Sequence, residues 1–190
     1  MEVRAFLNIM HIAERLKDVP RHCTTSNGRT EDVACHSWRI ALMAFFMRDE
    51  FPEADMDKVI RMCLIHDLGE AFTGDIPSFL KTAADEQHEE NVLCRWVATL
   101  PQPYADELRA LYDEMAARQT VEAKLYKALD NLEAVLQHNE SPLSTWQPLE
   151  YELNLTYGAD KAAFSPYLTS LRTALREDTE AKIAAGTEER

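Results

Sequence analysis

The sequence is poor in glycine, with five in 190 residues, and it has few runs in which β-branched and polar residues alternate. Both absences argue against a large β-sheet, because strands favour such alternation and their turns often need glycine. No stretch approaches about eighteen consecutive apolar residues, the length that a membrane-spanning helix requires. The first helical segment also lacks the apolar core of a signal peptide, so we expect a cytoplasmic protein with no membrane partner.

Positive charge is scarce as well. Twenty lysines and arginines stand against 33 aspartates and glutamates, which gives a formal net charge of −13. A nucleic-acid polymer is therefore a poor partner, because phosphate backbones are bound by basic surfaces. A small phosphate ester remains open, since a metal ion and a few local cations can reverse the field inside one pocket. The four cysteines have no C-x-x-C spacing, which favours free thiols in a reducing compartment.

Apolar residues recur at three- and four-residue spacing along most of the chain, and this pattern predicts helices. Asp32, Thr120 and either Asp55 or Asp57 are suited to cap helices, while the polar residues 18–32 read as a loop. We expect a single all-α domain of seven to nine helices over residues 1–185, with a frayed tail at 186–190. The predicted helices cover approximately residues 3–17, 32–51, 55–69, 85–100, 103–118, 120–138, 149–157 and 165–185.

The pair His66-Asp67 ends an apolar helical stretch, and Glu70 follows three residues after Asp67. Residues at this spacing share one face of a helix, so the imidazole and both carboxylates are expected near one point. Burying such groups is unfavourable unless they are paired, and a divalent metal ion pairs with all of them at once. A solvated helix end with a chance His-Asp dipeptide would give the same short pattern.

Two further polar residues lie on apolar helical segments, His36 upstream and Asp130 downstream. Each has an ordinary explanation: a core histidine bonded to a carbonyl for His36, and an ion pair with Lys127 for Asp130. Together with His66-Asp67 they form a pattern that a mononuclear metal phosphohydrolase needs. The only histidine between Asp67 and Asp130 is His88, whose acidic surroundings predict a solvated face, so one metal ion is expected rather than two.

Three segments resemble a known family. Residues 29–39 (RTEDVACHSWR), 66–77 (HDLGEAFTGDIP) and 127–131 (KALDN) are similar to the HD-domain phosphohydrolases, most of all to the YfbR-type 5′-deoxynucleotidases and their HD-domain-containing relatives. The resemblance runs in order over roughly residues 5–140, and residues 66–77 are its most specific part. It implies a helical fold, a homodimer and one divalent metal ion such as Mn²⁺, Co²⁺ or Mg²⁺.

The resemblance also implies the residues of a site. The resemblance implies that His22 occupies a position where the bacterial enzymes have a tryptophan, which helps them to exclude ribose. The choice between deoxyribose and ribose therefore stays open. Cys35 replaces an acidic residue that usually precedes the first histidine and supports it. The implied site residues are His36, His66, Asp67 and Asp130 as metal ligands, Glu70 as the catalytic residue, and Arg21, His22, Asp75, Ser78 and Lys81 as substrate-binding residues.

The sequence therefore predicts metal-dependent hydrolysis of deoxynucleoside 5′-monophosphates to deoxynucleoside and phosphate. Glu70 would position the attacking water or handle its proton, Arg21 and Lys81 would neutralise the phosphate, and Asp75 would bond a sugar hydroxyl. Two alternatives remain: a hydrolase of another small phosphate ester on the same scaffold, and a helical protein that binds nucleotides without cleaving them. A purely structural role leaves the polar groups on three apolar helices unexplained.

Overall fold

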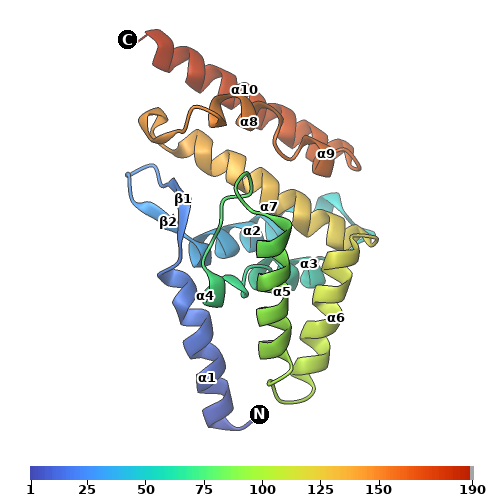
Figure 1. Cartoon of the computed structure of the whole chain (residues 1–190). Helices are drawn as coiled ribbons and strands as arrows, with labels where there is room; N and C mark the ends of the chain where they lie inside the picture. The colour runs from blue at the N-terminus through green and yellow to red at the C-terminus, as the bar shows by residue number, and fades with distance from the viewer. Residues whose placement is uncertain (189–190) are drawn as a thin grey trace.

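The structure, a computed structural model, describes residues 1–188 and is helical apart from one short hairpin (Figure 1). Eight of the α-helices within this range have seven residues or more, so the predicted all-α fold is confirmed. The elements in chain order are α1 Val3–Glu14, the 3₁₀ helix Arg15–Lys17, β1 Pro20–Thr24, β2 Thr30–Asp32, α2 Val33–Met47, the 3₁₀ helix Arg48–Glu50, α3 Met56–Ile65, α4 Glu70–Thr73, α5 Ala83–Val97, α6 Tyr104–Ala117, α7 Val121–Glu140, the 3₁₀ helix Leu143–Thr145, α8 Glu150–Thr156, α9 Ala159–Ala162 and α10 Pro166–Glu188.

Helix starts follow the capping residues in the sequence. Asp32, Asp55 and Thr120 stand at the N-caps of α2, α3 and α7, and each side chain accepts a hydrogen bond from the backbone N–H three residues on. Such a cap satisfies one of the donors that a helix start leaves free and stabilises the helix by about 1 kcal/mol. Of the two candidates for the start of α3, Asp55 is the cap.

Helix α7 is the centre of the fold and packs against α2, α3, α6 and α10 (Figure 1). Its apolar residues Leu125, Leu129, Leu132 and Val135 are completely buried. Each such side chain contributes about 1.5–3 kcal/mol through removal of apolar surface from water. Since α2 and α3 share this core, the polar residues that these helices carry on the same side are brought close to α7.

The prediction of a loop at residues 18–32 is wrong. Residues Pro20–Thr24 and Thr30–Asp32 pair as the antiparallel strands β1 and β2, with Gly28 at positive φ in the connecting turn. The strands are polar and short, so their sequence carries no alternating pattern. Their position depends instead on tertiary contacts, since β1 also packs against α7.

The helix predicted to continue through His66 and to end near Gly69 to Gly74 ends earlier. Ile65 is the last residue of α3, the chain then turns through residues 66–69, and the short helix α4 begins at Glu70. The hydroxyl of Tyr112 on α6 donates to the Ile65 carbonyl at 2.7 Å. At Gly69 an added Cβ would lie 2.9 Å from Cγ of Glu89, so a larger residue there would force the Glu89 side chain of α5 to shift.

The C-terminal helix α10 is described through Glu188, and residues 189–190 lie outside the described part of the chain. The predicted boundary between the domain at 1–185 and a tail at 186–190 therefore stays a prediction. None of the helices in the described range is long and apolar enough to cross a membrane.

Candidate metal-dependent active site

Four side chains from three parts of the chain converge beside α7: His36 from α2, His66 and Asp67 from the turn after α3, and Asp130 from α7. Nε2 of His36 lies 3.2 Å from Oδ1 of Asp130 and 4.0 Å from Oδ2 of Asp67. Nε2 of His66 lies 2.9 Å from Oδ2 of Asp67 and 3.7 Å from Oδ1 of Asp130. Two imidazole nitrogens and two carboxylate oxygens therefore face one point.

Both imidazole rings are held through their other nitrogen. Nδ1 of His36 lies 2.5 Å from Oε2 of Glu133, and Nδ1 of His66 lies 2.9 Å from the carbonyl oxygen of Cys63. With the N–H on Nδ1, each Nε2 keeps a lone pair for the shared point. Nε2 of His66 is buried and has no hydrogen-bond partner of suitable geometry in the described structure.

The electrostatics of the four groups fit a cation. Burial disfavours a charged imidazole, but Asp67 and Asp130 outweigh it and raise the pKa of His66 to about 10. Burial likewise opposes the carboxylate of Asp67, yet His66 lowers its pKa to about 2. In the metal-free protein a proton on the His66 ring thus supplies the positive charge that a metal ion would otherwise bring. The mixed nitrogen and oxygen donors suit a divalent ion of the first transition row.

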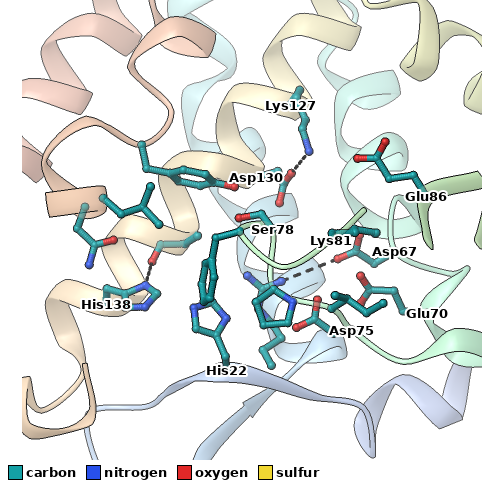
Figure 2. Close-up of a pocket in the computed structure, with 18 residues that line it drawn as sticks. His22, Asp67, Glu70, Asp75, Ser78, Lys81, Glu86, Lys127, Asp130 and His138 are labelled. Atoms are coloured by element: carbon teal, nitrogen blue, oxygen red, sulfur yellow. Dashed lines mark hydrogen bonds and ion pairs between the residues drawn. The ribbon is translucent and has the colours of Figure 1, made fainter. Parts of the chain in front are cut away.

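A cavity of about 200 Å³ adjoins this cluster, with Asp67, Asp130 and Glu70 in its wall (Figure 2). Glu70 is 4% exposed, and its Oε2 has no hydrogen-bond partner in the described structure. Burial, together with the charges of Asp67, Asp75 and Glu89, raises the pKa of Glu70 to about 10. Figure 2 shows Asp67 and Glu70 at one side of the cavity and His138 at the other.

All five residues predicted to bind substrate line the same cavity: Arg21, His22, Asp75, Ser78 and Lys81. Nε of Arg21 lies 3.1 Å from Oε2 of Glu31, and its Nη1 lies 4.0 Å from Oδ2 of Asp67. Nζ of Lys81 donates to Glu89 at 2.6 Å. Both cations are thus held at the wall by carboxylates, next to the cluster.

The alternative explanation of Asp130 as the partner of Lys127 is correct but incomplete. Nζ of Lys127 donates to Oδ2 of Asp130 at 2.7 Å, whereas Oδ1 faces His36 and His66. One carboxylate therefore serves an ion pair and the histidine cluster at once. Lys127 also lines the cavity, where it adds a third cation to Arg21 and Lys81.

The sequence analysis missed the support for His36. Glu133 is completely buried and follows Asp130 by three residues, one helical turn along α7. That spacing was the available signal, because residues three apart share a face of the helix. His138, which the sequence analysis did not single out, is 6% exposed and lines the cavity. The lining residues that the sequence did not single out are Glu86, Ala134, Leu153, Asn154 and Tyr157.

Comparison with known proteins identifies the family. The family model of the HD domain matches residues 13–172. The 5′-deoxynucleotidase HDDC2 of Bos taurus is 30% identical over 98% of this chain and 91% of its own length, and that of Homo sapiens is 29% identical over 98% and 92%. The crystal structure of a predicted metal-dependent phosphohydrolase from Magnetospirillum magnetotacticum MS-1 superposes with a TM-score of 0.78 at 29% identity, covering 95% of this chain and 93% of that one. The chain belongs to the HD-domain family.

Proposed function

We propose that the protein hydrolyses deoxynucleoside 5′-monophosphates to deoxynucleoside and inorganic phosphate with one divalent metal ion. The observation that carries this proposal is the convergence of His36, His66, Asp67 and Asp130 beside Glu70 in the wall of one cavity. Relatives of nearly the same length, 29–30% identical, bear the name 5′-deoxynucleotidase.

The metal ligands in this proposal are His36, His66, Asp67 and Asp130, with Mn²⁺, Co²⁺ and Mg²⁺ as candidate ions. When bound, such an ion polarises a phosphate oxygen and makes a water molecule acidic enough to react near neutral pH. Five carboxylates line the cavity (Asp67, Glu70, Asp75, Glu86 and Asp130) against three cations (Arg21, Lys81 and Lys127). Glu70 holds a proton, so four charged carboxylates stand against the three cations, and a bound metal ion would add the positive charge that a phosphate dianion needs.

Glu70 is the proposed catalytic residue. Its carboxyl group is buried and holds a proton in the metal-free protein, because its pKa is raised to about 10. Added positive charge beside Asp67 would lower this pKa toward neutrality. With a pKa near neutrality, the Glu70 carboxylate can take a proton from the attacking water and return one to the leaving 5′-oxygen.

Phosphate binding is assigned to Arg21 and Lys81. The side chain of Arg21 is 10% exposed, and its guanidinium lies between Glu31 and Asp67. This fixed position lets it meet non-bridging phosphate oxygens through two parallel N–H bonds. Lys81, held by Glu89, adds a second charge from the segment after α4.

The nucleoside is assigned to the remaining lining residues. Asp75 would accept a hydrogen bond from a sugar hydroxyl, and Ser78 lies in the segment beside it. His22 packs edge-on against Phe79, with ring centroids 5.3 Å apart, and so presents an aromatic wall to the sugar. A cavity of about 200 Å³ suits the reacting part of a mononucleotide and leaves no room for a polymer.

We further propose a cytoplasmic homodimer built from single domains over residues 1–185. Support for a dimer comes from α1, whose apolar residues Val3, Phe6, Leu7 and Met10 are 36–74% exposed. Free thiols at all four cysteines are compatible with a reducing compartment.

A phosphate-release assay tests the function. The purified protein, loaded with Mn²⁺ or Co²⁺, is incubated with deoxy- and ribonucleoside 5′-monophosphates and with sugar phosphates. Release from deoxynucleotides that disappears in Asp67→Asn but not in Asp49→Asn, a carboxylate 90% exposed, is the expected result. Release only from sugar phosphates would identify another ester as the substrate. Binding of nucleotides without release would identify a sensor.

A further inference from the structure

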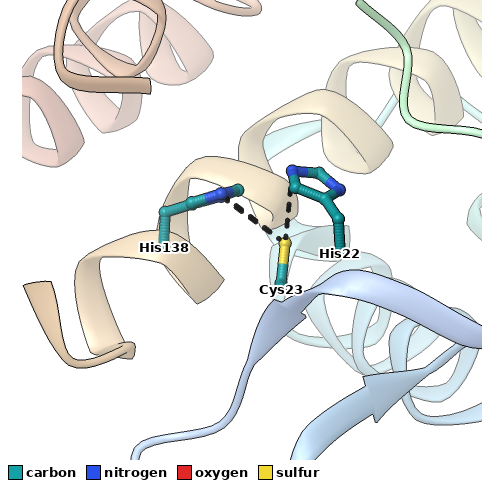
Figure 3. Close-up of side chains that lie close together, drawn as sticks. All are labelled: His22, Cys23 and His138. Atoms are coloured by element: carbon teal, nitrogen blue, oxygen red, sulfur yellow. Dashed lines mark hydrogen bonds between the residues drawn. The ribbon is translucent and has the colours of Figure 1, made fainter. Parts of the chain in front are cut away.

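A second cluster of metal-binding side chains lies outside the ligands already described. It joins His22 and Cys23 on β1 to His138 in the last turn of α7 (Figure 3). The sulfur of Cys23 and one ring nitrogen from each histidine all lie within 4.8 Å of one another. Eight residues separate His138 from Asp130, about 12 Å along the helix axis, so this cluster is distinct from the first.

A carboxylate completes the cluster from a third element. Oε1 of Glu150, the first residue of α8, lies 3.0 Å from Nε2 of His22 and 3.1 Å from Nε2 of His138. Sγ of Cys23 lies 3.7 Å from the same nitrogen of His138 and 4.0 Å from that of His22. The thiol and the carboxylate therefore each contact both imidazoles.

Two consecutive residues of a regular strand point to opposite faces, yet His22 and Cys23 both reach this point. The pairing of β1 with β2 is irregular between Pro20 and Thr24, and such an irregularity re-aims a side chain. The local backbone thus brings both residues to the cluster.

Three members of the cluster are buried, since Cys23 is 3%, His138 is 6% and Glu150 is 2% exposed, and the side chain of His22 is 20% exposed. Groups this polar are rarely buried together unless each has a partner. Burial opposes the thiolate, but hydrogen bonds with His138 and His22 outweigh it and lower the pKa of Cys23 to about 6. Burial disfavours a charged His138, but its contacts with Cys23 and Glu150 raise its pKa to about 10. The metal-free cluster therefore holds a thiolate beside an imidazolium, and a metal ion would take the place of the ring proton.

The outer contacts orient the donors. Nδ1 of His138 lies 2.8 Å from the Ala134 carbonyl oxygen and can donate to it, which leaves Nε2 with its lone pair toward the cluster. Oε2 of Glu150 accepts from the backbone N–H of Gln147 at 2.7 Å, which leaves Oε1 for both histidines. Two of the four donors, His138 and Glu150, are thus held by a second contact, as metal ligands usually are.

We propose that His22, Cys23, His138 and Glu150 form a second metal site, for Zn²⁺ or a similar ion that accepts sulfur and nitrogen ligands. Tetrahedral zinc places neighbouring ligand atoms about 3.3–3.6 Å apart, given bonds of about 2.0–2.3 Å. The four separations between an imidazole nitrogen and the sulfur or the carboxylate oxygen, 3.0–4.0 Å, lie within about half an ångström of these values. Four protein ligands make a closed, structural site that ties β1, and with it Arg21, to α7 and α8.

The test is the optical spectrum of the full-length protein, stripped with a chelator and reloaded with Co²⁺. The first cluster offers no sulfur ligand, so a sulfur-to-cobalt charge-transfer band reports the second site alone. The band is expected in the unmodified protein, in Asp67→Asn and in Cys94→Ser, where the exposed thiol is removed, but not in Cys23→Ser. Zinc analysis is expected to give one equivalent in Asp67→Asn and none in Asp67→Asn combined with Cys23→Ser.

Absence of the band from the unmodified protein would overturn the proposal without reliance on any variant. A band that persists in Cys23→Ser would overturn it too, since the sulfur would come from elsewhere. If Cys23 titrates near pH 6 both without zinc and with zinc added, the cluster is a hydrogen-bonded pair of thiolate and imidazolium and not a metal site. Circular dichroism on each variant shows that loss of metal is not loss of fold.

Discussion

Oε2 of Glu133 lies 2.5 Å from Nδ1 of His36, and both side chains are completely buried. The contact fixes the ring so that its Nε2 faces Asp67 and Asp130. Burial opposes the charge of Glu133, but His36 together with Arg21 and Arg39 lowers its pKa, so the carboxylate stays ionised. An ionised acceptor on the far nitrogen strengthens a histidine as a metal ligand.

Replacing Glu133→Gln removes that charge while it keeps the size of the side chain. We expect metal affinity at the first cluster to fall about 10- to 100-fold, as is common when the outer partner of a histidine ligand is lost. Titration of the metal-free protein with Mn²⁺ measures it. Glu90→Gln is the control, because Glu90 is exposed on α5. Equal affinity in both variants would contradict the role of Glu133.

Replacing Glu70→Gln is expected to lower turnover about 10²- to 10⁴-fold, the usual contribution of a general acid or base. Metal content should not change, because Glu70 is not among the four ligands. Phosphate release and metal analysis on the same sample give both quantities, with the exposed Glu90→Gln as the control. Loss of metal with residual activity would instead make Glu70 a ligand.

Metal uptake is expected to release a proton at pH 7. The pKa of His66 is about 10 in the metal-free protein, so its ring is protonated and must lose a proton before Nε2 can bind. Affinity should therefore rise with pH between 6 and 8. Calorimetry in two buffers of different ionisation enthalpy measures the proton count, and a count of zero would contradict the assignment. The raised pKa of His66 also stabilises the metal-free fold. This stabilisation is fully present below about pH 6.5 and is lost as the pH rises through about 10.

Replacing Tyr112→Phe removes the hydrogen bond that its hydroxyl donates to the Ile65 carbonyl at 2.7 Å. Ile65 ends α3 directly before His66, so this bond helps to set where the ligand turn begins. We expect the free energy of unfolding to fall by about 0.5–1.5 kcal/mol. Urea denaturation measures it against Tyr104→Phe, whose ring is 41% exposed. An equal effect in both variants would show that the bond is immaterial.

Local signals account for what the sequence predicted well. Asp32 and Thr120 cap helices through contacts within three residues, and the apolar spacing of Leu125, Leu129 and Leu132 gives α7 directly. The hairpin was missed because its polar strands are positioned by α7 and not by their own pattern. The early end of α3 was missed because the apolar spacing continues past it, while tertiary contacts stop the helix.

The candidate site also has a part that could be predicted from the sequence and a part that could not. The resemblance supplied His36, His66, Asp67 and Asp130 as ligand positions, and the structure places these four together. The second cluster has no short spacing to read, because Cys23 and His138 are 115 residues apart. The packing of β1 against α7 brings them into contact.

The most direct test of the account is anomalous X-ray diffraction from crystals soaked in Mn²⁺. The account predicts one manganese peak bonded at about 2 Å to Nε2 of His36, Nε2 of His66 and a carboxylate oxygen each of Asp67 and Asp130. Absence of a manganese peak from these four side chains, or a shell that lacks either His36 or Asp130, would contradict it.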